Sequence, residues 1–254
     1  MTLLLVLLAL SLPLGGTGTI LNLGALPVNL PSFLAIIALA WSFIAALRRD
    51  IRPDTAGWAA IGWAGAWLAS SLAAPLAWVP ASQSAWHLAV GPLLFAVARP
   101  LLPPRSKNIL LAGSGAASVI FVFLHIAGNG GIPALGTGPA IPWSAFLAKP
   151  LTGAGPQAYP ELSLLAGLLP RGGLLLAGAG IFLIWALGSR VFHIIRRPRG
   201  GQDAVLPALT LLALIASGFV FNPLAGTGLG LESWLVLTAL IPPARPAYNG
   251  KRRA

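Results

Sequence analysis

The stretch RGGLLLAGAGIFLIWALGSRVF, residues 171–192, decides the fold class. Its charged residues, Arg171 and Arg190, lie near the two ends, and the residues between them are uncharged and mostly apolar. A helix needs about 20 apolar residues to cross the hydrocarbon core of a bilayer. The stretch also lacks the period-two alternation of a membrane β-strand. It therefore predicts a membrane-spanning helix.

Other apolar stretches of comparable length occur along the whole chain. The first follows Met1, is interrupted by Pro13, Gly15 and Gly16, and has no basic segment before it, so we interpret it as a retained span rather than a cleaved signal peptide. We expect an all-α integral membrane protein, a single polytopic domain over residues 1–254 with about eight transmembrane helices. The expected spans are 2–20, 31–47, 57–77, 84–102, 108–127, 171–192, 204–221 and 226–242.

The composition supports a membrane protein. Charged residues make up 8% of the chain and hydrophobic residues 57%, whereas about a quarter of an ordinary soluble domain is charged. The chain has no cysteine and three scattered histidines, which excludes disulfides and thiolate metal sites. The common phosphate-loop, dinucleotide and zinc-helix motifs are also missing. We therefore expect neither a metal nor a cofactor.

The basic residues indicate an orientation. With eight spans, 14 of the 16 Lys and Arg residues fall on one side of the membrane, and only Lys149 and Arg171 on the other. Because cytoplasmic loops are enriched in Lys and Arg, both termini are expected in the cytoplasm. The bases follow neither an amphipathic face nor an RNA-binding motif, so membrane lipids are expected partners and nucleic acid is not.

One long segment, residues 128–170, is then expected outside the cytoplasm. Such loops often carry chemistry, and residues 162–169 within it have the length of a re-entrant or interfacial helix. Lys149 and Arg171 could bind a phosphate through charge-assisted hydrogen bonds, or could snorkel to lipid headgroups. Glu161 and His125 are candidate catalytic groups toward a sugar hydroxyl, with an interfacial role as the alternative for His125. Glu232 could pair with Arg171 or Lys149.

Two stretches resemble a known family. The sequence FLAKPLTGAGP, residues 146–156, is similar to the opening of the large periplasmic segment in the O-antigen ligase and polymerase family, polytopic enzymes that transfer glycans from a lipid-pyrophosphate carrier. The sequence LSLLAGLL, residues 162–169, followed by PRGG, residues 170–173, resembles that family's entry into its next transmembrane helix. The family carries a histidine shortly before the Leu-rich stretch, where this chain has AYPE, residues 158–161.

The resemblance implies a bacterial plasma-membrane protein of surface-polysaccharide assembly. It would transfer or bind a lipid-pyrophosphate-linked saccharide at the outer face without a metal, with Arg171 and Lys149 binding the pyrophosphate and Glu161 or His125 assisting the attacking hydroxyl. The missing histidine keeps a second interpretation open, a non-catalytic subunit that binds envelope-glycan assembly proteins. A small-solute transporter is a third, which the scarcity of charges inside the spans disfavours.

Overall fold

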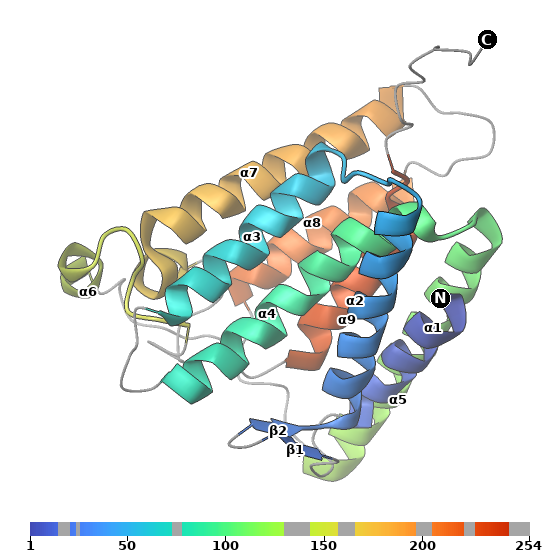
Figure 1. The fold of residues 1–254 in the computed structure, drawn as a ribbon, viewed down its shortest axis with the longest axis horizontal. Helices are drawn as coiled ribbons and strands as arrows, with labels where there is room; N and C mark the ends of the chain where they lie inside the picture. The colour runs from blue at the N-terminus through green and yellow to red at the C-terminus, as the bar shows by residue number, and fades with distance from the viewer. Residues whose placement is uncertain are drawn as a thin grey trace.

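The protein is described from a computed structural model. It covers residues 1–14, 21–23, 26–72, 78–129, 143–156, 166–196, 205–220 and 227–243, and parts of these ranges are described by their backbone alone. The described chain is a bundle of α-helices with one small β-hairpin (Figure 1). The helices are α1 Thr2–Ser11, α2 Leu30–Arg48, α3 Thr55–Ser71, α4 Trp78–Ala98, α5 Pro104–Asn129, α6 Trp143–Ala148, α7 Leu168–Arg196, α8 Val205–Val220 and α9 Thr227–Leu240.

The expected helical fold is confirmed, but its N-terminal part differs from the expectation. A continuous helix over 2–20 is wrong, because α1 ends at Ser11 and a 3-10 turn, Leu12–Leu14, follows it. Pro13 lies in that turn and has no N–H to continue the helical hydrogen bonds. The strands β1 (Leu21–Leu23) and β2 (Leu26–Val28) then pair antiparallel. With 10 residues, α1 is about 15 Å long, half the thickness of a hydrocarbon core.

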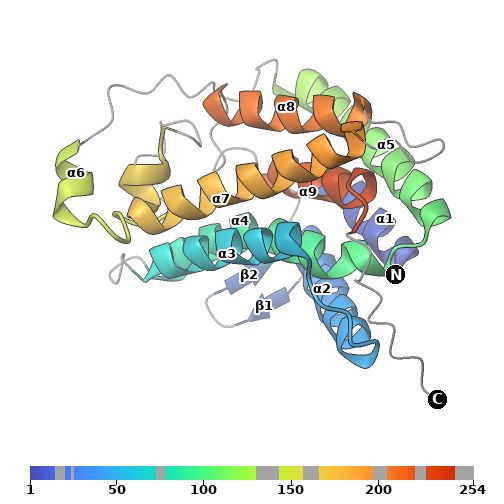
Figure 2. The same cartoon turned by 90° about the horizontal axis from the view of Figure 1, so that it is seen from above.

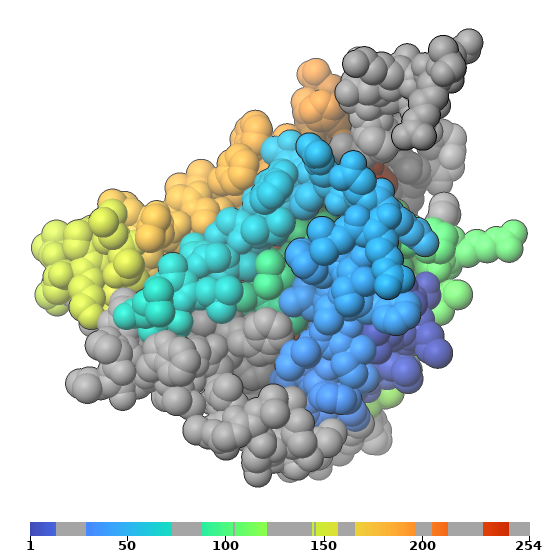
Figure 3. All heavy atoms as spheres, in the orientation of Figure 1, coloured from blue at the N-terminus to red at the C-terminus, as the bar shows by residue number. Residues whose placement is uncertain are grey.

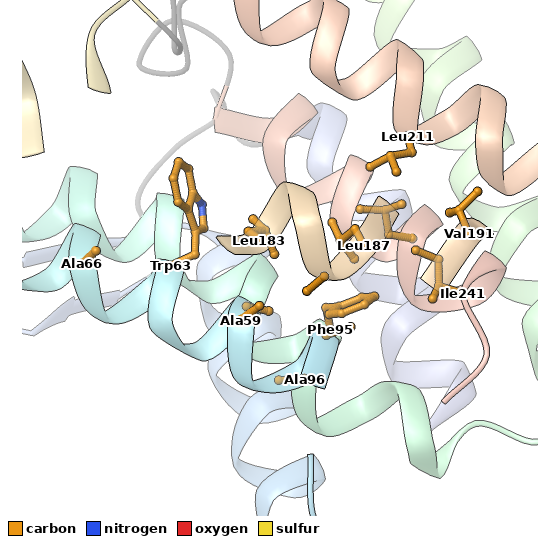
Figure 4. Close-up of a cluster of buried hydrophobic side chains, with 14 of the residues drawn as sticks. Ala59, Trp63, Ala66, Phe95, Ala96, Leu183, Leu187, Val191, Leu211 and Ile241 are labelled. Atoms are coloured by element: carbon orange, nitrogen blue, oxygen red, sulfur yellow. The ribbon is translucent and has the colours of Figure 1, made fainter. Parts of the chain in front are cut away.

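The helices pack in tiers. In Figure 2, α7 lies between α8 on one side and α3 and α4 on the other, while α1 and α5 lie at the right-hand end of the bundle. One core cluster joins α3, α4 and α7 through alanine, aromatic and aliphatic side chains, among them Ala59, Trp63 and Leu187 (Figure 4). Gly180 lets α7 approach closely, because a Cβ there would lie 2.7 Å from the Trp63 ring. Small residues at helix contacts are typical of membrane bundles.

Two of the described helices, α2 and α7, are long and apolar enough to cross a membrane by length and composition. Shorter apolar helices lie at Thr2–Ser11, Leu88–Leu101 and Leu231–Leu240. On the face seen in Figure 3, α2 and α3 form much of the described surface. Large hydrophobic side chains on α2 are exposed, including Trp41, Phe43 and Leu47. The count of eight spans and the orientation stay predictions.

Candidate functional site

The segment after α6 docks onto the start of α7. Residues 149–156 lie against residues 170–175, and we call this arrangement the glycine latch. Main-chain hydrogen bonds in both directions join the two segments, so the latch needs no particular side chain to close. The bonds are Ala154 N–H to Pro170 O (2.8 Å), Gly155 N–H to Arg171 O (2.9 Å), Leu174 N–H to Pro150 O (2.8 Å) and Leu175 N–H to Leu151 O (3.2 Å).

Two glycines make this close contact sterically feasible. Gly153 has φ +65° and Gly173 has φ +62°, a region that L-residues with side chains rarely adopt. A Cβ on Gly153 would lie 2.4 Å from the carbonyl carbon of Arg171, and one on Gly173 would lie 2.5 Å from that of Leu151. Gly173 also interrupts the helical geometry of α7, with ψ −157°. The break frees the main-chain groups that the latch uses.

Arg171 is enclosed by the latch. Its side chain is 0% exposed, its N–H donates to Gly167 O at 2.9 Å, and its carbonyl accepts from Gly155. A Cβ on Gly167 would lie 2.6 Å from the Arg171 Nη1 atom, so the guanidinium lies directly over this glycine. The interpretation that Arg171 snorkels to headgroups is wrong for this structure. Lys149, by contrast, is exposed, and its carbonyl accepts from Gly153 at 2.9 Å.

The other candidates are placed less completely. Glu161 lies outside the described residues, and for His125 the structure gives only its backbone, in α5. The expected pairing of Glu232 with Arg171 or Lys149 stays a prediction. The buried Glu232 carboxylate in α9 accepts a hydrogen bond from Ser118 in α5. The structure therefore brings together the Lys149 segment and Arg171, and tests neither catalytic candidate.

The burial of a second arginine, Arg99, was not predicted from the sequence, because Arg99 was counted among the basic residues of a loop. Arg99 follows α4 in the 3-10 turn Arg99–Leu101 and is 1% exposed. Its Nη2 donates to Asp54 Oδ1, and its guanidinium lies 4.4 Å from the centroid of the Phe95 ring. Asp54 Oδ1 also accepts from Gly57 N–H at 2.9 Å, which caps α3. The sequence signal that could have indicated this pair is Asp54, an acidic residue directly before a helix.

Two further cations lie near Arg99. Arg190 in α7 acts electrostatically on Arg99, and Arg99 acts on Lys107 in the first turn of α5. Arg190 also donates from Nε and Nη2 to Pro242 O at 3.3 Å each. Burial, together with the charge of Arg99, lowers the pKa of Lys107. We call Arg99, Lys107, Arg190 and Asp54 the basic joint. Its residues come from α5, α7, the turn after α4 and the position just before α3.

Comparisons with protein families, with curated proteins and with solved structures found no match for this chain. The resemblance to O-antigen ligases and polymerases therefore rests on the residues quoted above.

Proposed function

We propose that the chain is a multi-pass protein of a bacterial plasma membrane, with about eight spans and both termini in the cytoplasm. The exposed apolar surface supports this. Only 28% of the most apolar stretch of α2 and 33% of that of α7 are buried inside the bundle. A core helix of a soluble protein would be mostly buried. Side chains such as Trp41, Ile181 and Trp185 are exposed on these helices. Apolar surface of this extent suits lipid as its solvent.

Within that membrane, the protein transfers or binds a lipid-pyrophosphate-linked saccharide at the outer face. The observation that supports this is the glycine latch. The two stretches that resemble the glycan-transferase family, residues 146–156 and 170–173, are separated in sequence and are joined in the structure by main-chain hydrogen bonds. If the two stretches form one binding site, they must lie together in this way.

The latch suggests different roles for its two cations. Lys149 is exposed and able to contact an anion directly, while the buried Arg171 positions the loop and contributes its positive charge from beneath. A pyrophosphate would therefore contact Lys149 first. This geometry also favours the second candidate function, a non-catalytic subunit that binds the carrier lipid, since Lys149 is the exposed cation of the two.

Binding is the first test of the proposal. Purified protein in nanodiscs would be titrated with a polyprenyl-pyrophosphate oligosaccharide, and the same lipid lacking pyrophosphate would serve as the ligand control. Lys149→Ala should weaken binding about tenfold, as expected for the loss of one charge-assisted hydrogen bond. Arg105→Ala, an exposed base expected on the opposite face, is the matched control. Equal binding of both lipids would refute the proposal.

Turnover separates the enzyme from the binding subunit. The same nanodiscs, supplied with an acceptor saccharide, would be assayed for release of polyprenyl pyrophosphate. Release that is lost in Glu161→Gln supports the transferase, and binding without release supports the subunit.

Topology gives an independent test. Reporter fusions after Gly130 and after Arg199 should lie on opposite sides of the membrane. Finding both on one side would contradict the eight-span arrangement, whatever the outcome of the binding assay.

A further inference from the structure

The basic joint has buried hydrogen-bond donors that the described part of the chain leaves unpaired. Arg99 is almost fully buried, yet its Nε and Nη1 atoms have no hydrogen-bond partner among the described residues. Its Nη2 atom donates a hydrogen bond to Asp54 Oδ1, which also accepts the hydrogen bond that caps α3. Leaving buried N–H groups of a charged side chain unpaired is energetically costly. An acceptor supplied from outside would offset this cost.

The charges at the joint also do not balance. Arg99, Lys107 and Arg190 lie within electrostatic range, and Asp54 is the carboxylate that pairs with Arg99. Lys107 and Arg190 are half-buried, so they reach the surface while Arg99 lies beneath it. The two Arg190 bonds to Pro242 O fix that guanidinium in place. Such an arrangement favours an anion with several acceptor oxygens.

We propose that the basic joint is a phosphate-binding site, with Arg99 as its floor and Lys107 and Arg190 as its rim. Guanidinium groups match phosphate oxygens in a bidentate geometry, and a lysine adds a compact charge. The phosphate belongs either to the headgroup of an anionic phospholipid or to a soluble phosphate compound. The site lies at the other end of α7 from the glycine latch, and it does not depend on the function proposed for the latch.

The test uses the full chain in nanodiscs of two compositions, phosphatidylcholine alone and phosphatidylcholine with phosphatidylglycerol. Thermal unfolding is measured in each with and without inorganic phosphate, against chloride at equal ionic strength. A rise in Tm with phosphate in phosphatidylcholine identifies a soluble ligand. A rise that requires phosphatidylglycerol identifies a lipid headgroup. No rise under either condition overturns the proposal.

Variants separate a built site from general attraction to negative charge. Arg190→Gln and Lys107→Gln should each weaken the apparent affinity about tenfold. Arg105→Gln and Arg48→Gln change exposed bases outside the joint and should leave the affinity unchanged. Equal losses in all four variants would show that the joint has no special role. The rim variants are preferred because Arg99 itself is part of the core.

Discussion

The two ends of α7 hold buried arginines in opposite ways. At the glycine latch, Arg171 is enclosed by main-chain hydrogen bonds and by glycines that let backbones meet. At the basic joint, Arg99 is held by side chains, namely the carboxylate of Asp54 and the ring of Phe95. The latch therefore depends on shape and the joint on charge. Substitutions that alter one property at a time should affect the two regions differently.

The largest effect is expected at the charge-dependent end. Asp54→Ala leaves the buried Arg99 without its carboxylate and removes the cap of α3, and should lower the free energy of unfolding by about 4 kcal/mol. Denaturation in mixed micelles measures it. Arg52→Ala is the matched control, because its ion pair with Asp50 is exposed on both sides and contributes little. Similar losses in both variants would contradict the role given to Asp54.

The shape-dependent end should respond to a single methyl group. Gly173→Ala places a Cβ 2.5 Å from the Leu151 carbonyl carbon at a positive φ, so the backbone must shift and latch hydrogen bonds break. We expect a loss of about 3 kcal/mol in unfolding free energy. Gly178→Ala, on the same helix with open space around its Cβ, should instead stabilise by about 0.5–1 kcal/mol. A loss at Gly178 like that at Gly173 would mean that α7 as a whole tolerates no change.

A third substitution, Gly167→Ala, tests how firmly the Arg171 side chain is held. A Cβ at Gly167 meets the end of the Arg171 side chain rather than backbone, so the guanidinium can move aside. Gly167→Ala should therefore cost about 1–2 kcal/mol, less than Gly173→Ala. The same micelle denaturation compares them. Equal costs would show that Arg171 has no alternative position and that its place in the latch is fixed.

The smallest expected effect is on the pH dependence of the free energy of unfolding. Burial and Arg99 lower the pKa of Lys107 in the folded protein, so the unfolded chain binds more protons between that lowered pKa and the usual lysine value. Stability should therefore rise slightly as pH increases through this window. Lys107→Gln should flatten the rise, whereas Arg105→Gln should not. An unchanged pH profile in Lys107→Gln would place the effect on another group.

The helices with clear apolar stretches could be predicted closely from the sequence. The span expected at 31–47 is the helix Leu30–Arg48, and the one expected at 204–221 is Val205–Val220. Such elements are predictable because apolar length and flanking bases are local properties. The break in α7 was not predicted, since Gly173 adopts a non-helical conformation only because a distant segment supplies the matching hydrogen bonds.

For the candidate site, the sequence singled out two residues of the latch but not its geometry. Lys149 and Arg171 were selected from one property, their exclusion from the main basic clusters, and the structure places their segments together. The burial of Arg99 could not be predicted by that reasoning, because counting bases by loop treats every arginine at a helix end as solvated. Only the packing of α3 against α4 brings Asp54 to it.

The alanine face of α3 makes that helix a stiff connection along the bundle. Ala56, Ala59 and Ala60 are buried with almost no exposed area, and side chains this short leave no rotamers that could absorb a displacement. A shift of α3 at Asp54 must therefore move its neighbours as well. Since α3 packs along α7, we expect a change in charge at the basic joint to move α3 and α7 together.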